Sequence, residues 1–268
     1  MNGVGMTSLV HVSATGLAVV GLDDPVIEFR VAHPPVNALE NELVDNLLSA
    51  FDMLDARHRV VVISSGLERI FFAGGDLKTI AAQQPELHRL YVEKIQTLVT
   101  RIRELDQPVI SQVHGHCLGG GLEIALAGDL IVASDDAMAG LPEVTLGILA
   151  AAGGVHHLVR RVGEGQARLL LLLGRSISSS RAAQIGLFDE VVPREDLPAT
   201  VAEIAEHLAS LPREAVRINK ALINKAFDRT TAEGLAAELE AWLDVRRSGE
   251  AQHALDRFMS VERRRERP

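Results

Sequence analysis

The chain has 268 residues, 47 % of them hydrophobic, which is enough to bury a large core and argues against intrinsic disorder. Its 27 Lys and Arg residues against 36 Asp and Glu give a formal net charge of −9, which argues against a nucleic-acid or anionic-membrane partner. The single cysteine, Cys117, excludes an internal disulfide and fits a reducing compartment. No apolar run reaches membrane-spanning length and no charged leader precedes an apolar segment, so we expect a cytoplasmic protein.

Short apolar segments alternate with helical patterns through much of the chain, which predicts parallel strands joined by crossover helices. The first elements expected are a hairpin over residues 17–22 and 26–31, a helix over 40–54 and a strand over 59–66. This strand is a continuous apolar run, typical of burial on both faces. The segment IFFAGGDL that follows, at residues 70–77, is interpreted as a turn.

A 3.6-residue apolar period predicts a long helix over residues 86–105. Its apolar stripe consists of Leu87, Leu90, Ile95, Leu98, Ile102 and Leu105. The elements expected next are a strand over 108–115, a helix from a glycine triplet to Gly128, a strand over 129–134, a helix over 163–173 and a strand over 188–193.

From Val201 onward the sequence shows helical patterns and no strand pattern. Turn residues divide this part into four stretches, with breaks at 211–212, 228–230 and 248–249. We therefore divide the chain into an α/β core, residues 1–200, and a helical C-terminal region, residues 201–268.

Three consecutive glycines, Gly119 to Gly121, open a helix in the segment GHCLGGGLEIALAGD. Two nucleotide-binding motifs fail here, because G-x-G-x-x-G would need glycine at Ile124 and G-x-x-x-x-G-K-[ST] would need a lysine. The first N–H groups of a helix lack internal acceptors, and glycine lets a substrate carbonyl oxygen approach them without meeting a Cβ. An oxyanion hole is the functional interpretation, and close helix–strand packing is the structural alternative.

A second glycine turn, FFAGGDLK at residues 71–78, also contains an acidic residue. Alone it is typical of an ordinary loop, but two separated turns that each offer a backbone N–H are what an oxyanion hole requires. Glu123 follows the glycine triplet, and Glu143 lies in AGLPEVTLGI before an apolar run typical of a strand. In an apolar setting such carboxyl groups have raised pKa values and suit proton transfer, whereas a lone glutamate is more often solvated.

Other reactive side chains carry weaker patterns. His114 and His116 could share one face of a strand, but no further ligand stands at metal-binding spacing, so we expect no metal site. The adjacent His156 and His157 point apart on a helix, which disfavours chelation. Cys117 has no evident paired base and no G-x-S-x-G segment is present, so a nucleophilic mechanism is not expected.

Taken together, these segments resemble the enoyl-CoA hydratase/isomerase (crotonase) superfamily from about residue 17 to residue 260. The markers are HPPVNAL, FFAGGDLK, QPVISQVHGHCLGGGLEIALAGDLIVAS, LPEVTLGI and LLLGRSISSSRAAQIGLFDEVVP. The resemblance implies an α/β fold built as a spiral of ββα units, with the C-terminal helices used for trimerisation in a homotrimer or homohexamer. It also implies an acyl-CoA substrate and no separate cofactor, since coenzyme A is part of that substrate.

The resemblance also assigns roles to single residues, motif by motif. The backbone N–H groups of Gly75 and Gly120 would stabilise a thioester enolate. Glu123 would activate water as a base and Glu143 would protonate Cα as an acid, with the roles reversed for dehydration. The implied acyl-CoA contacts are Ala73, Gly75, Asp76, Leu77, Lys78, Gly120 and, near the adenine, Phe227.

One departure from the superfamily bears on the reaction. Its hydratases usually carry P-G-A-G-G after the second glutamate, whereas this chain has AAAGG at residues 150–154, with Ala151 in place of the glycine whose N–H helps to hold the attacking water. Alanine keeps that N–H but adds a methyl group. Hydration of the 2,3-double bond of an enoyl-CoA is the leading hypothesis. An isomerase, a decarboxylase and a noncatalytic acyl-CoA-binding protein stay open as alternatives.

Overall fold

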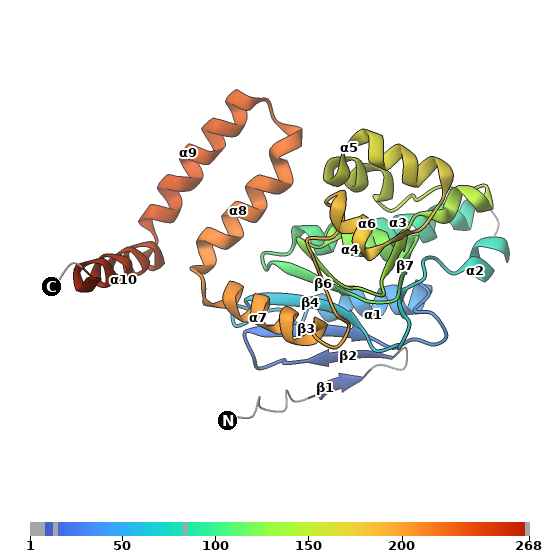
Figure 1. Cartoon of the computed structure of the whole chain (residues 1–268), viewed down its shortest axis with the longest axis horizontal. Helices are drawn as coiled ribbons and strands as arrows, with labels where there is room; N and C mark the ends of the chain where they lie inside the picture. Colours follow the sequence, from blue (N-terminus) through green and yellow to red (C-terminus); the bar gives the residue numbers. More distant parts are fainter. Residues whose placement is uncertain (1–8, 13–15, 83–84, 266–268) are drawn as a thin grey trace.

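The computed structural model describes residues 9–12, 16–82 and 85–265, and Figure 1 shows an α/β core from which the C-terminal helices extend. Within these residues the larger sheet has seven strands. In sheet order they are β1 (Leu9–Val12), β2 (Leu17–Val20), β3 (Val26–Val31), β4 (Val60–Ser65), β6 (Val109–Val113), β8 (Leu130–Ser134) and β11 (Glu190–Val192). The smaller sheet consists of β10 (Ile177–Ser178), β9 (Met138–Gly140), β7 (His116–Leu118) and β5 (Ile70–Phe72).

The chain passes from the larger sheet to the smaller one in a repeated way. β4 leads to β5, β6 to β7 and β8 to β9, and each short strand is followed by a helix. β3, β4, β6, β8 and β11 run parallel, as do β5, β7 and β9 within the smaller sheet. This repeated ββα unit is the spiral that the resemblance implied, so the expected fold class is confirmed.

Helices cover the sheets and form the end of the chain (Figure 1). The helices of the core are α1 (Asn41–Phe51), α2 (Leu77–Ala82), α3 (Pro85–Glu104), α4 (Gly120–Ala127), the 3₁₀ helix η1 (Pro142–Leu146), α5 (Gly154–Leu173), α6 (Ser179–Gln184) and α7 (Leu197–Ser210). The core is followed by α8 (Arg213–Lys225), the 3₁₀ turn η2 (Ala226–Asp228), α9 (Thr231–Arg247) and α10 (Gly249–Arg265). The breaks between these helices lie at the predicted positions. In the described part of the chain, no helix is long and apolar enough to cross a membrane.

Strand β4 is buried on both faces, as its continuous apolar sequence predicted. Val61 and Ile63 join the main core, to which α1, α3 and α4 also contribute apolar side chains. Val60 and Val62 point the opposite way, into a second cluster that contains Leu197 of α7. The predicted boundary between core and helical region falls inside α7, and that division stays a prediction.

Two segments fold differently from what the sequence predicted. Residues 70–77, interpreted as a turn, contain strand β5 and the start of α2. The apolar run after Glu143 forms η1 instead of a strand, because Pro142 opens a helical turn and Gly147, with a φ of +74°, ends it.

Two predicted helices also differ in detail. The helix expected over 163–173 already begins at Gly154 and has a kink at Gly163, where φ is +76°. In α3, Leu87 and Leu90 are exposed although the apolar period placed them in the stripe, whereas Tyr91 is buried. The start of α3 therefore lies outside the core, which the helix enters at Tyr91.

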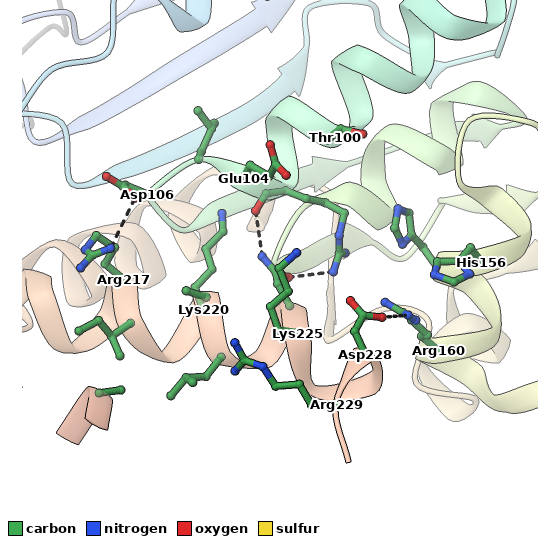
Figure 2. Close-up of a pocket in the computed structure, with 18 of the residues that line it drawn as sticks. Thr100, Glu104, Asp106, His156, Arg160, Arg217, Lys220, Lys225, Asp228 and Arg229 are labelled. Carbon is green, nitrogen blue, oxygen red and sulfur yellow. Dashed lines mark hydrogen bonds and ion pairs between the residues drawn. The ribbon is translucent and has the colours of Figure 1, made fainter. Parts of the chain in front are cut away.

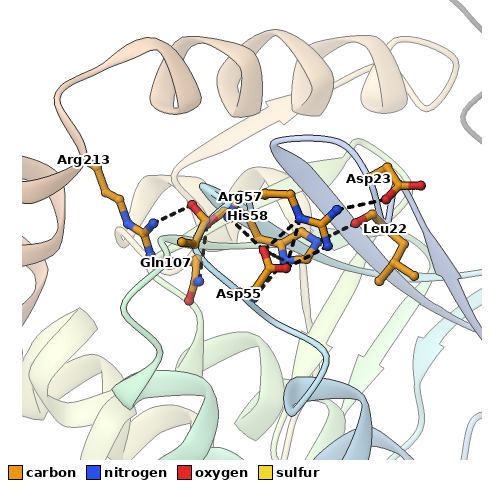
Figure 3. A network of polar contacts seen from close by, with 8 residues as sticks. Leu22, Asp23, Asp55, Arg57, His58, Gln107 and Arg213 are labelled. Carbon is orange, nitrogen blue, oxygen red and sulfur yellow. Dashed lines mark hydrogen bonds and ion pairs between the residues drawn. The ribbon is translucent and has the colours of Figure 1, made fainter.

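A polar network joins the N-terminal hairpin to the C-terminal helices (Figure 3). His58 is fully buried; its Nδ1 accepts a hydrogen bond from Asp55 N (3.0 Å), so its Nε2–H donates to Leu22 O (2.9 Å). In the same loop the Ala56 carbonyl oxygen accepts a 2.6 Å hydrogen bond from Arg213, the first residue of α8. These contacts fix where α8 leaves the core.

An ion pair between a buried lysine and a half-buried aspartate holds the middle of α8. Lys220 Nζ lies 2.8 Å from Asp129 Oδ2 and donates to the carbonyl oxygen of Gln107, also at 2.8 Å. Asp129 follows Gly128, the C-cap residue of α4, so the pair connects α8 with the end of the helix that the glycine triplet opens. Large apolar side chains on the helices beyond α8 stay exposed, among them Leu235, Leu239, Trp242, Phe258 and Met259.

Candidate active site

The two glycine turns meet at the carboxyl ends of β5 and β7, which are neighbouring parallel strands. A Cβ atom on Gly74 would lie 3.2 Å from the carbonyl oxygen of Leu118 and 3.3 Å from Gly120 N. Gly74 also has a φ of +106°, a conformation that side chains disfavour. A Cβ on Gly121 would collide with the carbonyl oxygen of Phe72. Glycine is therefore required for this close backbone approach, which agrees with the packing interpretation of the triplet, and the oxyanion-hole interpretation stays a prediction.

Each turn presents a backbone N–H group that is free for an external acceptor. Gly120 is the first residue of α4, so its N–H has no partner within the helix. Neither Gly120 N nor Gly75 N donates a hydrogen bond to an acceptor in the described residues. The positive end of the α4 dipole lies at the same place. The turns thus offer the pair of donors that an oxyanion hole requires.

Glu123 lies in the first turn of α4, and only 4 % of it is exposed. Its Oε1 accepts hydrogen bonds from the N–H groups of Ala152 (2.7 Å) and Gly154 (2.8 Å). Burial raises the pKa of this carboxyl from 4.5 to about 7; the negative charge of Glu143 adds to the rise, and the two N–H donors oppose it. A carboxyl group with a pKa near neutrality can both take and return a proton.

Glu143 follows the proline that opens η1. Its Oε1 lies so close to Gly119 that a Cβ atom on this glycine would be 2.8 Å away. Its Oε2 is buried and has no hydrogen-bond partner among the described residues. Burial raises the pKa of Glu143 as well. A buried carboxyl oxygen without an internal partner suits an external one, such as a reacting molecule.

The AAAGG segment anchors the first glutamate. The N–H groups of Ala152 and Gly154 hold the Glu123 carboxylate, and the carbonyl oxygen of Ala151 accepts a hydrogen bond from Gln96 of α3 (2.7 Å). The N–H of Ala151 donates to nothing in the described part of the chain. The residue that departs from the hydratase pattern therefore sits beside the carboxylate, with its N–H available.

Comparison with known proteins agrees with this geometry. The sequence model of the enoyl-CoA hydratase/isomerase family matches residues 22–267. The chain belongs to this family. It is 36 % identical over 228 residues to the bovine protein named enoyl-CoA hydratase domain-containing protein 2, mitochondrial, and the match covers 82 % of this chain and 77 % of that relative.

Solved structures of the enoyl-CoA hydratase/isomerase family have the same fold. The structure of an enoyl-CoA hydratase from Bacillus anthracis superposes with a TM-score of 0.87 at 32 % identity and covers 96 % of both chains. An enoyl-CoA hydratase from Thermoplasma volcanium superposes with a TM-score of 0.83 at 30 % identity, with 87 % of this chain and 93 % of that one covered. The chain is thus a member of the crotonase superfamily, as the sequence resemblance indicated.

The acyl-CoA contacts implied for this family member lie mostly in one continuous segment. Ala73 and Asp76 are half-buried on either side of the glycine pair, and Leu77 and Lys78 are exposed at the start of α2. The Asp76 side chain accepts hydrogen bonds from the N–H groups of Lys78 and Thr79, both at 3.1 Å, and thereby starts that helix. Contacts from outside the segment hold it as well, from Leu39 N to Gly74 O and from Asp76 N to the Tyr91 hydroxyl.

Phe227 lies apart from this cluster. It belongs to η2 and is 70 % exposed, with the Arg160 guanidinium 5.3 Å from the ring centre. Arg160 also pairs with Asp228 (2.6 Å) at the edge of a cavity of about 660 Å³ between α3, α5 and α8, which Figure 2 shows. No hydrogen bond or ring contact within the described residues joins Phe227 to either glycine turn.

Two residues that support the site were not singled out in the sequence. Asn37 is fully buried, with a φ of +51°, and its Nδ2 donates to Val31 O (3.2 Å), Ser65 Oγ (2.9 Å) and Phe71 O (2.8 Å). Tyr91 donates from its hydroxyl to Leu39 O. The HPPVNAL motif contained Asn37, but nothing in a sequence shows which carbonyl groups an amide side chain will reach.

Proposed function

We propose that this family member is an enoyl-CoA hydratase, which adds water to the 2,3-double bond of an acyl-CoA thioester. The observation that carries the proposal is the pair of glutamates, the buried Glu123 and the half-buried Glu143, both with raised pKa values, beside two free backbone N–H groups. A binding protein without catalysis has no need for two carboxyl groups at one place whose ionisation is made costly by burial.

The reaction uses these groups in a fixed order. The N–H groups of Gly75 and Gly120 hydrogen-bond the thioester oxygen, where negative charge develops. Glu123 takes a proton from water as the water oxygen bonds to C3, and the double-bond electrons move onto the thioester oxygen as an enolate. Glu143 then gives its proton to C2 as the carbonyl re-forms. The reverse sequence dehydrates a 3-hydroxyacyl-CoA.

An assay of crotonyl-CoA hydration tests this proposal. The reaction is monitored through the loss of ultraviolet absorbance that occurs when the conjugated thioester is hydrated. Glu123→Gln and Glu143→Gln should each lower kcat by about 10²- to 10⁴-fold, because each removes one proton-transfer group. Glu164→Gln, on the exposed side of α5, serves as the control and should keep wild-type activity. Full activity in Glu123→Gln contradicts the assignment.

A double-bond isomerase or a decarboxylase is the second candidate, because Ala151 replaces the glycine of the hydratase pattern. Isomerisation needs one proton shuttle, for which Glu143 suffices. Turnover in ¹⁸O-labelled water separates the reactions, since only hydration places solvent oxygen in the product. Acyl-CoA binding without turnover across a panel of enoyl-CoA chain lengths supports the noncatalytic alternative instead.

The remaining assignments rest on the family. We propose that Ala73, Asp76, Leu77 and Lys78 contact the thioester and pantetheine arm, that Phe227 contacts the adenine, and that no cofactor is needed beyond the coenzyme A of the substrate. A homotrimer or homohexamer is supported by the exposed apolar side chains of the C-terminal helices. Sedimentation equilibrium tests the assembly. We also propose a cytoplasmic location for this protein, whereas the name of the bovine relative places that protein in mitochondria.

A further inference from the structure

Tyr91 is the only tyrosine of the chain, and it is 4 % exposed. Its hydroxyl accepts a hydrogen bond from the N–H of Asp76 (2.9 Å) and donates one to the carbonyl oxygen of Leu39 (2.8 Å). One oxygen atom thus joins α3 to two loops, and one of these loops contains the glycine turn at Gly75.

The hydroxyl occupies the place of a rung in a parallel β-ladder. Leu39 and Gly75 form an isolated parallel bridge. In a complete bridge Leu39 would accept directly from Asp76 N and donate to Gly74 O. The second bond exists, from Leu39 N to Gly74 O at 3.0 Å, whereas the first passes through the phenol oxygen. The hydroxyl oxygen of Tyr91, which projects from α3, therefore replaces the direct hydrogen bond between Asp76 N and Leu39 O.

This arrangement holds the peptide groups on both sides of Gly75. The preceding peptide group, whose N–H belongs to Gly75 itself, is fixed through Gly74 O by Leu39. The following peptide group is fixed through Asp76 N by Tyr91. Glycine rotates more freely than any other residue, so the direction of its N–H must be set by such outside contacts. A Cβ on Gly75 would lie 3.1 Å from the Tyr91 oxygen, so the hydroxyl also packs against this residue.

We propose that Tyr91 is a positioning residue, which aims the Gly75 N–H at the thioester oxygen through its hydroxyl bridge between Asp76 N and Leu39 O. The inference rests on the proposed function only in that Gly75 is taken as an oxyanion donor. Tyr91 does not touch the substrate itself. Its hydroxyl must stay protonated to donate to Leu39, and burial raises its pKa to about 12, well above the working pH.

Tyr91→Phe removes the bridge and keeps the ring. Displacing one oxyanion donor should lower kcat for crotonyl-CoA hydration by about 10- to 100-fold and change KM by less than about threefold, because the donor acts mainly on the developing charge. The carbonyl stretching frequency of bound butyryl-CoA, measured by infrared difference spectroscopy, should move toward that of the free thioester. Ser179→Ala is the matched control, since it deletes a buried hydroxyl that donates to Asp135 O (2.6 Å) and should leave both readings unchanged.

The carbonyl measurement separates the two proposals. Butyryl-CoA has no double bond to hydrate, so its frequency reports the oxyanion donors whichever reaction the enzyme performs. A Tyr91-dependent frequency without any hydration by the wild type overturns the proposed function and supports the inference. An unchanged frequency in folded Tyr91→Phe overturns the inference, even where the wild type hydrates crotonyl-CoA.

A second measurement leaves the hydroxyl in place. Because the chain has one tyrosine, growth with 3-fluorotyrosine labels Tyr91 alone. Fluorine makes the phenol a weaker acceptor for Asp76 N and a stronger donor to Leu39 O. We expect the ¹⁹F resonance to shift when butyryl-CoA binds, since the bridge is coupled to the Gly75 N–H. If saturating butyryl-CoA leaves the ¹⁹F resonance of Tyr91 unchanged, the result contradicts the positioning role.

Discussion

Glu123→Gln should make the protein more stable at alkaline pH, although we expect it to slow hydration strongly. Burial raises the pKa of Glu123 from 4.5 to about 7, so the folded protein binds this proton more tightly than the unfolded chain does. Below pH 4.5 the carboxyl is protonated in both states and its burial carries no ionisation penalty. As the pH rises from 4.5 through about 7, the unfolded state releases the proton first, and stability falls.

The size of the effect follows from the shift. One pKa unit corresponds to about 1.4 kcal/mol, so a rise from 4.5 to about 7 amounts to about 3 kcal/mol above pH 7. Glutamine does not ionise, and its Oε1 can accept the same two hydrogen bonds, from Ala152 N and Gly154 N. The variant should therefore match the wild type near pH 4.5 and exceed it by about 3 kcal/mol at pH 8.

Reversible urea unfolding at pH 5 and pH 8, at equal protein concentration, measures this difference. Glu164→Gln controls for general effects of removing a carboxylate, because its side chain is 68 % exposed and should change the free energy of unfolding by less than about 0.5 kcal/mol at either pH. A stability difference between Glu123→Gln and wild type that is the same at both pH values refutes the reasoning, as does a variant that is less stable at pH 8.

Three further predictions concern other parts of the fold. Gly186→Ala, at a φ of +75° and with nothing within 4 Å of the new Cβ, should lose about 1–2 kcal/mol of stability and keep its activity. Gly119→Ala should lose at least as much stability, because its φ of +54° and ψ of −130° are accessible almost only to glycine. It should also lose activity, because its Cβ would lie 2.8 Å from Oε1 of Glu143, the carboxyl group that we propose protonates C2. Lys220→Ala, which leaves the part-exposed Asp129 without its ion-pair partner, should lower the free energy of unfolding by about 1–3 kcal/mol, against less than about 0.5 kcal/mol for the exposed Arg89→Ala in a chemical-denaturation assay. Cys117 is fully buried, which raises the pKa of its thiol, so Ellman's reagent should detect one thiol only after unfolding; a rapid reaction in the native protein contradicts its burial.

The long helices and strands could be predicted because their hydrophobic patterns extend over enough residues to identify the element. β4 has six buried residues in succession, and most of α3 follows one apolar stripe. The strands of the smaller sheet could not be predicted in this way. β7 and β9 have three residues each, too few for an alternating pattern, and β7 lies between glycines that indicate turns.

The candidate site was predictable in its parts and not in its assembly. The glycine turns and the two glutamates are local patterns, whereas their meeting depends on the pairing of β5 with β7, which is set by the rest of the fold. The donors that hold Glu123 are backbone N–H groups, and a sequence carries no information on where these point. Tyr91 lies within the helix predicted over residues 86–105, and no sequence pattern marks it, because its contacts are made by a single oxygen atom.

The exposed face of α9 has a consequence for optical spectroscopy. Trp242 is the only tryptophan of the chain and is 61 % exposed, and Leu239 and Leu235 lie one and two turns before it, respectively, on the same side of the helix. Indole emission moves to shorter wavelength and becomes protected from iodide when a second surface excludes water from the ring. The fluorescence of the unlabelled protein, followed on dilution, therefore reports directly whether this helix face is covered and at what concentration it becomes free.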